Sequence, residues 1–124
     1  MHNSSPITFI AWDRANLAAV RDVLAGLQRD GIILRRGHLL LETSWLGSGA
    51  RDFYATAWRW GVQDCPLFYD LARRGKLLVT TSDTVISCGD NDNIADARAG
   101  IVQELIAAET PQQLGGLLAD AAED

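Results

Sequence analysis

This 124-residue chain lacks several features, and each absence argues against a class of protein. No apolar run approaches the roughly 18 to 20 residues that cross a bilayer as a helix, so we expect no membrane-spanning helix. The first six residues have neither a basic start nor an apolar stretch, so we expect no secretion signal. The only cysteines, Cys65 and Cys88, fit neither a disulfide framework nor a zinc-binding spacing. These absences predict a cytoplasmic protein with two free thiols and no membrane contact.

Positive charge is also scarce, and it is unevenly placed. Eleven Lys and Arg against sixteen Asp and Glu leave a formal net charge of -5, which argues against broad binding to nucleic-acid backbones. Residues 1–82 hold ten basic and seven acidic side chains, a sum of +3, whereas residues 83–124 hold one basic and nine acidic, a sum of -8. The acidic third fits a solvated surface, a carboxylate cluster that holds metal, or a patch that docks a basic partner.

The remaining composition indicates one globular domain spanning residues 1–124. With 48% apolar and 22% charged residues, the chain can bury a core of ordinary size. Apolar periodicity and turn residues predict the following elements: a strand at 7–12, a helix between Asp13 and Gly31, two strands within 32–43 that turn near Arg36-Gly37, helices at 50–60 and 64–75, a hairpin within 76–88, a helix with its apolar face from Ile94 to Ile106, and a last helix opened by a capping box at Thr110-Pro111.

The predicted order of elements is β-α-β-β-α-α-β-β-α-α. Two hairpins favour a mixed or antiparallel sheet of about five strands with helices packed on it, which is an α+β fold. A doubly wound parallel fold is the second choice, because strict alternation of strand and helix is missing. One longer strand with a bulge at Gly37 is the alternative to the first hairpin.

Carboxylates recur near the ends of the predicted strands, where they could share a metal ion. Asp13 follows the first strand, Glu42 ends the third, and Asp90 and Asp92 follow the last. Mg²⁺ takes oxygen ligands, and three or four converging acids could hold such ions and activate water for phosphodiester hydrolysis. This pattern therefore indicates a metal-binding and catalytic set made of these four acids, as one interpretation of the sequence.

Part of the same pattern is similar to a known class of enzymes. The segment Ser87–Asp92, together with Asp13 and Asn16, resembles the acidic motifs of metal-dependent nucleases of the PIN and NYN class. The resemblance implies a Mg- or Mn-dependent nuclease or phosphodiesterase, with nucleic acid as its partner, and this is the alternative function. The spacing between the motifs departs from that class, and Asp13 and Asp92 also fit helix N-caps while Asp90 fits a turn. Caps and turns, with no cofactor, are the preferred interpretation.

Covalent catalysis would need a nucleophile beside a base, and few residues could serve. The only histidines are His2 and His38, so a Cys88–His38 pair would depend on the fold bringing the two together. Gly47-Ser48-Gly49, before a predicted helix, could offer backbone N–H groups to an anion beside Arg51. Ser48 is more simply a helix N-cap, and no further residue pattern supports either motif.

Aromatic residues cluster between residues 45 and 69, which hold seven of the nine in the chain. On the helix predicted at 50–60, one face carries Phe53, Ala57 and Trp60, and another carries Tyr54 and Trp58. One helix cannot easily bury both faces against a sheet. Either the following helix covers the second face, or its two aromatic side chains are exposed.

Exposed Tyr and Trp beside Arg match the composition of interface hot spots. We therefore predict a binding surface formed by Arg51, Tyr54, Trp58 and Arg59. The predicted function is a small non-catalytic binding or regulatory module that contacts a protein partner, a second copy of itself in a homodimer, or a ligand.

Overall fold

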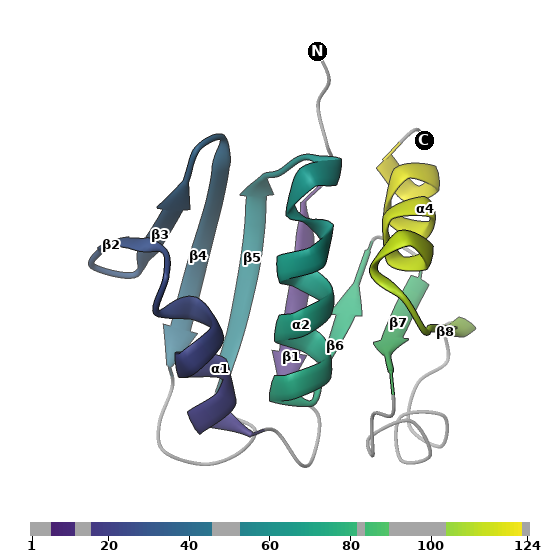
Figure 1. Cartoon of the computed structure of the whole chain (residues 1–124), viewed down its shortest axis with the longest axis horizontal. Helices are drawn as coiled ribbons and strands as arrows, with labels where there is room; N and C mark the ends of the chain where they lie inside the picture. The colour runs from purple at the N-terminus through teal and green to yellow at the C-terminus, as the bar shows by residue number, and fades with distance from the viewer. Residues whose placement is uncertain (1–5, 12–15, 46–52, 82–83, 90–103, 123–124) are drawn as a thin grey trace.

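The computed structural model describes residues 6–11, 16–45, 53–81, 84–89 and 104–122 (Figure 1). Its elements in chain order are β1 (Ile7–Ala11), α1 (Leu17–Leu24), β2 (Gln28–Asp30), β3 (Ile33–Arg36), β4 (Leu39–Trp45), β5 (Phe53–Arg59), the 3-10 turn η1 (Val62–Asp64), α2 (Cys65–Gly75), β6 (Leu77–Thr80), β7 (Thr84–Cys88), β8 (Glu104–Ala108) and α4 (Pro111–Ala122). They form an α+β fold with helices packed on one mixed sheet, which confirms the predicted fold class.

The sheet contains eight strands among the described residues, where about five were expected. Their order across the sheet is β2-β3-β4-β5-β1-β6-β7-β8. All neighbouring strands run antiparallel except β7 and β8, which run parallel. The hairpins predicted within 32–43 and 76–88 are confirmed as β3–β4 and β6–β7. Gly37, with φ of 62°, supplies the left-handed backbone that the first of these turns needs.

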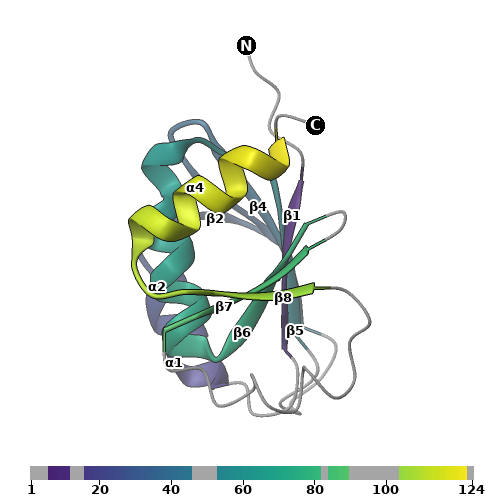
Figure 2. The same cartoon turned by 90° about the vertical axis from the view of Figure 1, so that its right-hand side faces the viewer.

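The described helices all lie on one face of the sheet, as Figure 2 shows from the side. Phe9 of β1 packs against Phe68 of α2 with ring centroids 5.2 Å apart, and Trp60 meets the same ring at 6.1 Å. Leu114 and Leu118 add α4 to this core. The main core therefore lies between the sheet and the helices. Within the described part of the chain, no helix is both long and apolar enough to span a membrane.

Local sequence signals determine where these helices begin and end. Asn16 caps α1, because its side-chain Oδ1 accepts a hydrogen bond from a first-turn N–H at 3.1 Å. Pro66 occupies the first turn of α2, and Lys76, which follows the last residue of that helix, caps it in the left-handed conformation. The predicted cap of α4 is also present, since the Thr110 hydroxyl accepts from the Gln113 N–H at 3.1 Å.

Two predicted helical segments are wrong, and a third helix is shorter than predicted. Residues 53–59 form β5 instead of part of a helix at 50–60, and residues 104–106 belong to β8. The helix predicted between Asp13 and Gly31 is shorter, because α1 ends at Leu24 and residues 28–30 form an edge strand. In each segment, pairing with a neighbouring strand satisfies the backbone and outweighs local helix propensity. Asp13 and residues 90–103 lie outside the described part of the chain.

A bulge in β5 changes which of its residues face the core. The register with β4 shifts at Leu40, which pairs with Arg59 where an unbroken ladder would pair it with Trp58. Trp58 is therefore an extra residue, and a bulge of this kind places two successive residues on the same side of the sheet. As a result Trp58 and Arg59 are both exposed, and Trp60 returns to the core.

Candidate functional site

The sheet face opposite the helices is accessible over only part of its width. Strand alternation places Leu78 and Val85 on this face at its β6–β8 side, where both are at most 2% exposed and form a small cluster of their own. On the β3–β5 side, Trp58 is 50% exposed and Tyr54 is 44% exposed. The accessible part of the face is therefore built by β3, β4 and β5.

Six side chains on these three strands form a surface that we call the aromatic–arginine patch: Arg35, Leu40, Glu42, Tyr54, Trp58 and Arg59. The register places Arg35, Leu40 and Arg59 in one row, since Leu40 pairs with both arginines. Because neighbouring strands lie about 4.8 Å apart, the two arginine backbones are separated by roughly 10 Å. The patch thus combines two large aromatic groups with two cations.

A hydrogen bond orients the exposed indole of the patch. Nε1 of Trp58 donates to Oε1 of Glu42 on the adjacent strand at 2.8 Å. This bond satisfies the only polar atom of the indole and leaves its apolar ring for contact with a partner. Neither Arg35 nor Arg59 forms an ion pair with a carboxylate of the described residues. Their guanidinium groups can therefore engage carboxylates from outside.

The residues predicted for a binding surface are placed by a strand, not by a helix. Tyr54, Trp58 and Arg59 lie on the patch, whereas Arg51 lies outside the described residues. Alternation along β5, rather than two apolar helix faces, is what exposes the aromatic pair. Sequence reasoning missed Arg35, because the pairing that brings it alongside β4 and β5 is not local. The sequence feature that could have identified Arg35 is the alternation of apolar and polar residues along β3, in which Leu34 is buried and Arg35 is exposed.

Only one of the four acids predicted to bind metal lies in the described part of the chain. Glu42, predicted at a strand end, sits in the middle of β4, so that placement is wrong. Asp13, Asp90 and Asp92 lie outside the described residues. The strands that precede them, β1 and β7, are both antiparallel to β6, so their C-terminal ends point in the same direction. Across the described segments, no group of three or more His, Cys, Asp or Glu could hold a metal ion. The metal-dependent alternative stays a prediction.

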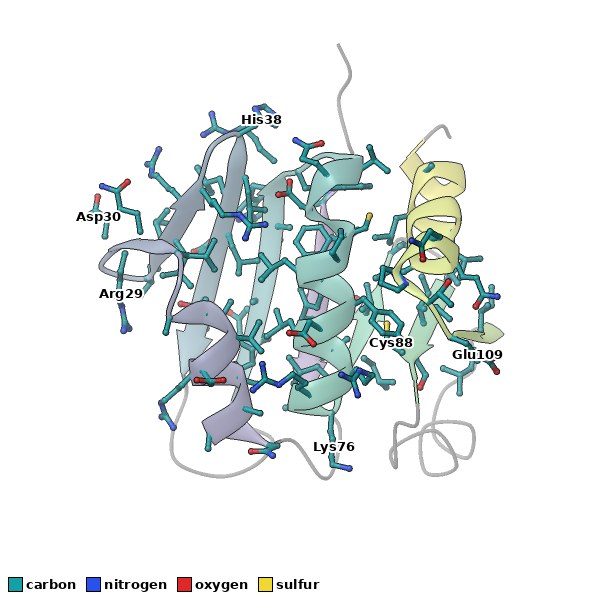
Figure 3. The ribbon with its side chains drawn as sticks, in the orientation of Figure 1. Arg29, Asp30, His38, Lys76, Cys88 and Glu109 are labelled. Atoms are coloured by element: carbon teal, nitrogen blue, oxygen red, sulfur yellow. The ribbon has the colours of Figure 1, made fainter. Side chains whose placement is uncertain are left out.

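Both thiols are free and buried in the fold. Burial raises the pKa of Cys88 to about 12, and burial together with the Asp64 charge raises the pKa of Cys65 to about 11. His38 lies in the β3–β4 turn and Cys88 lies at the end of β7, well apart in Figure 3. The Cys88–His38 pair considered from the sequence is therefore not formed, and both thiols are protonated near neutral pH.

Comparison of the chain with protein-family models, with curated proteins and with solved structures finds no match. The surface chemistry of the fold is therefore the guide to what this protein binds.

Proposed function

We propose that this protein is a non-catalytic binding module that associates with a second copy of itself through the aromatic–arginine patch. The observation that carries the proposal is the pair of side chains Tyr54 and Trp58, each about half exposed on a sheet face that no described helix covers. Tryptophan, tyrosine and arginine are the residue types enriched where truncation costs most binding energy at protein interfaces. Glu42 adds to the proposal because it holds the indole in one orientation before any partner arrives.

Charge complementarity favours a second copy as the partner. The patch carries Arg35 and Arg59, and residues 83–124 of the same chain carry a formal charge of -8. In a two-fold dimer, each copy can bring its basic patch to the acidic part of the other, so the same contact forms twice. Opposite charges would orient the two copies, and the aromatic side chains would supply the apolar area that excludes water.

Sedimentation equilibrium over a wide range of protein concentration tests the proposal. We expect the wild-type protein to dimerise, and Trp58→Ala and Arg59→Glu each to raise the dimer Kd by about tenfold or more, as hot-spot changes do. Ile32→Ala and Arg73→Glu are matched controls, because Ile32 is an exposed residue of the β2–β3 turn and Arg73 lies on α2, on the other side of the sheet.

Circular dichroism melts show whether each variant keeps its fold, so that a lost dimer is not mistaken for unfolding. A wild-type chain that remains monomeric at every concentration would overturn the proposal. Control variants that weaken the dimer as much as Trp58→Ala would overturn it as well, because the contact would then lie elsewhere.

A further inference from the structure

A pocket of about 360 Å³ opens on the helix side of the sheet, next to the edge strand β2. The aromatic–arginine patch lies on the opposite face, so the pocket is a separate feature. Its lining comes from α1, the connection to β2, and the strands β2 to β4, and it includes Arg21, Leu24, Ala25, Leu27, Arg29 and Leu34. Small-molecule sites have volumes of about 300–1,000 Å³, so this pocket has room for a small ligand.

The floor of the pocket is apolar. Leu24, Leu27 and Leu34 are each less than a tenth exposed and belong to the main core. Thr43 also lines the pocket, but its hydroxyl already donates to the Ile32 carbonyl at 3.0 Å. A ligand resting on this floor must therefore present a hydrocarbon surface to it.

The charged groups at the pocket are basic. Arg29 Nε donates to the Gly31 carbonyl at 3.2 Å, which anchors the guanidinium at the β2–β3 turn, and Arg29 forms no ion pair with a carboxylate of the described residues. The two acids next to the pocket arginines in the sequence are directed elsewhere among the described residues. Asp22 pairs with Arg74 at 2.6 Å. Asp30 belongs to the other face of β2, and Figure 3 shows it pointing away from Arg29.

We propose that this pocket binds a small anion with an apolar tail, whose tail lies on the three leucines and whose head group pairs with Arg29. A carboxylate and a phosphate share this chemistry, because both accept paired N–H donors from a guanidinium. A fully hydrated inorganic anion does not fit, since it has no apolar surface to place on the floor. A chain of medium length matches both the volume and the single charged end.

Isothermal titration of the full chain with decanoate, decyl phosphate and decanol tests the inference. We expect one molecule of either anion to bind per chain, and the relative affinity of the two anions shows which head group Arg29 prefers. Decanol, which has the same tail without the charge, should bind about tenfold more weakly or worse, because it cannot form a charge-assisted pair.

Three variants locate the binding within the fold. Arg29→Gln should weaken decanoate binding about tenfold, whereas Arg73→Gln is the control, because Arg73 is exposed on α2 and belongs neither to the pocket lining nor to the aromatic–arginine patch. Ala25→Trp should abolish binding, because Ala25 is exposed just after α1 and an indole there fills the pocket without entering the core.

The wild-type protein failing to bind either anion would overturn the inference, as would equal losses in Arg29→Gln and Arg73→Gln. The result is independent of self-association, because Arg29→Gln changes the pocket side alone and leaves the aromatic–arginine patch intact. A protein that dimerises and binds no anion would support self-association and overturn the anion site. A protein that binds anions as a monomer would support the anion site and overturn self-association.

Discussion

A single inserted residue determines which side chains stand at the exposed end of β5. Without the bulge at Trp58, strict alternation would turn Arg59 toward the helices and Trp60 toward solvent. The bulge keeps Arg59 beside Trp58 and returns Trp60 to its edge-on contact with Phe68. An aromatic ring and a cation therefore share the open face, where either one alone would make a weaker binding surface.

The two neighbouring indoles should differ in their response to a soluble quencher. Trp58 is 50% exposed and Trp60 only 6%, so acrylamide should reach the first far more readily. Replacing Trp58 by Phe should remove easily quenched fluorescence, and replacing Trp60 by Phe should remove fluorescence that resists quenching. Stern–Volmer slopes, measured at a dilution that keeps the protein monomeric, test this expectation. A greater fall in slope for the Trp60 variant would contradict the placement of the bulge.

The raised pKa values of the two thiols predict that the folded protein loses stability at alkaline pH. Their pKa values are about 11 for Cys65 and about 12 for Cys88 in the folded protein, against an ordinary 9.0. The unfolded chain therefore releases these protons first as the pH rises. The stabilising contribution is fully present below pH 9 and is lost as the pH rises toward 12. Urea unfolding across this range should show a shallower decline for a Cys65→Ala, Cys88→Ala double variant than for the wild type.

The same pKa shifts predict slow alkylation of the native thiols. At pH 8 a rise from 9.0 to about 11 lowers the thiolate fraction of Cys65 roughly a hundredfold, and burial restricts access further. Iodoacetamide should label both cysteines slowly in the folded protein and rapidly in denaturant. Rapid labelling of Cys88 without denaturant would show that β7 is not packed as described.

At the scale of elements, β5 explains why part of the fold could not be predicted from the sequence. The bulge shifts the phase of the strand, so Phe53, Ala57 and Trp60 are buried at the i, i+4, i+7 spacing of a helix. Only Thr56 in this strand is β-branched, and its alanines favour helix. The apolar spacing and the residue propensities both favour a helix. The segment forms a strand because it pairs with β1 and β4.

Elements that carry their own local signals were predictable. Pro66 marks the first turn of α2, Gly37 marks a hairpin turn, and the Thr110 cap marks the start of α4, and none of these depends on distant residues. The candidate site shows the same division. Tyr54 and Trp58 were identified from aromatic clustering and an assumed helical spacing, which proved to be a strand, whereas Arg35 joins them only through strand pairing.

Two glycines near α1 should respond in opposite ways to alanine. A Cβ on Gly75, at the end of α2, would lie 2.5 Å from Cγ2 of Val20 on α1, so Gly75→Ala should destabilise the protein by about 1–3 kcal/mol through overpacking. A Cβ on Gly26 would meet nothing within 4 Å, so Gly26→Ala should be neutral or stabilising by up to about 1 kcal/mol. Chemical denaturation of both variants measures the difference. Equal effects would show that α1 and α2 do not pack as closely as described.

At the scale of the whole molecule, the β2 edge of the sheet is poorly suited to pairing with another chain. The edge strand β2 has only three residues, all exposed, and two of them are charged. Short, charged edge strands oppose edge-to-edge pairing with another chain. The β6–β8 side of the open face already buries its apolar residues, so the β3–β5 side is the accessible portion. The aromatic–arginine patch is thus the accessible part of this face, and it is the contact that we propose for a second copy.

The salt dependence of association should report how the two charged parts of the chain meet. The Debye length falls from about 10 Å at 0.1 M salt to about 3 Å at 1 M, so added salt should weaken a contact between the basic patch and the acidic residues 83–124. We expect the wild-type dimer Kd to rise several-fold over this range. Arg59→Glu should flatten the dependence because it removes the attraction, whereas Trp58→Ala should raise the Kd at every salt concentration and leave the slope unchanged. A dimer that tightens with salt would contradict charge pairing and would indicate a contact made by the aromatic residues alone.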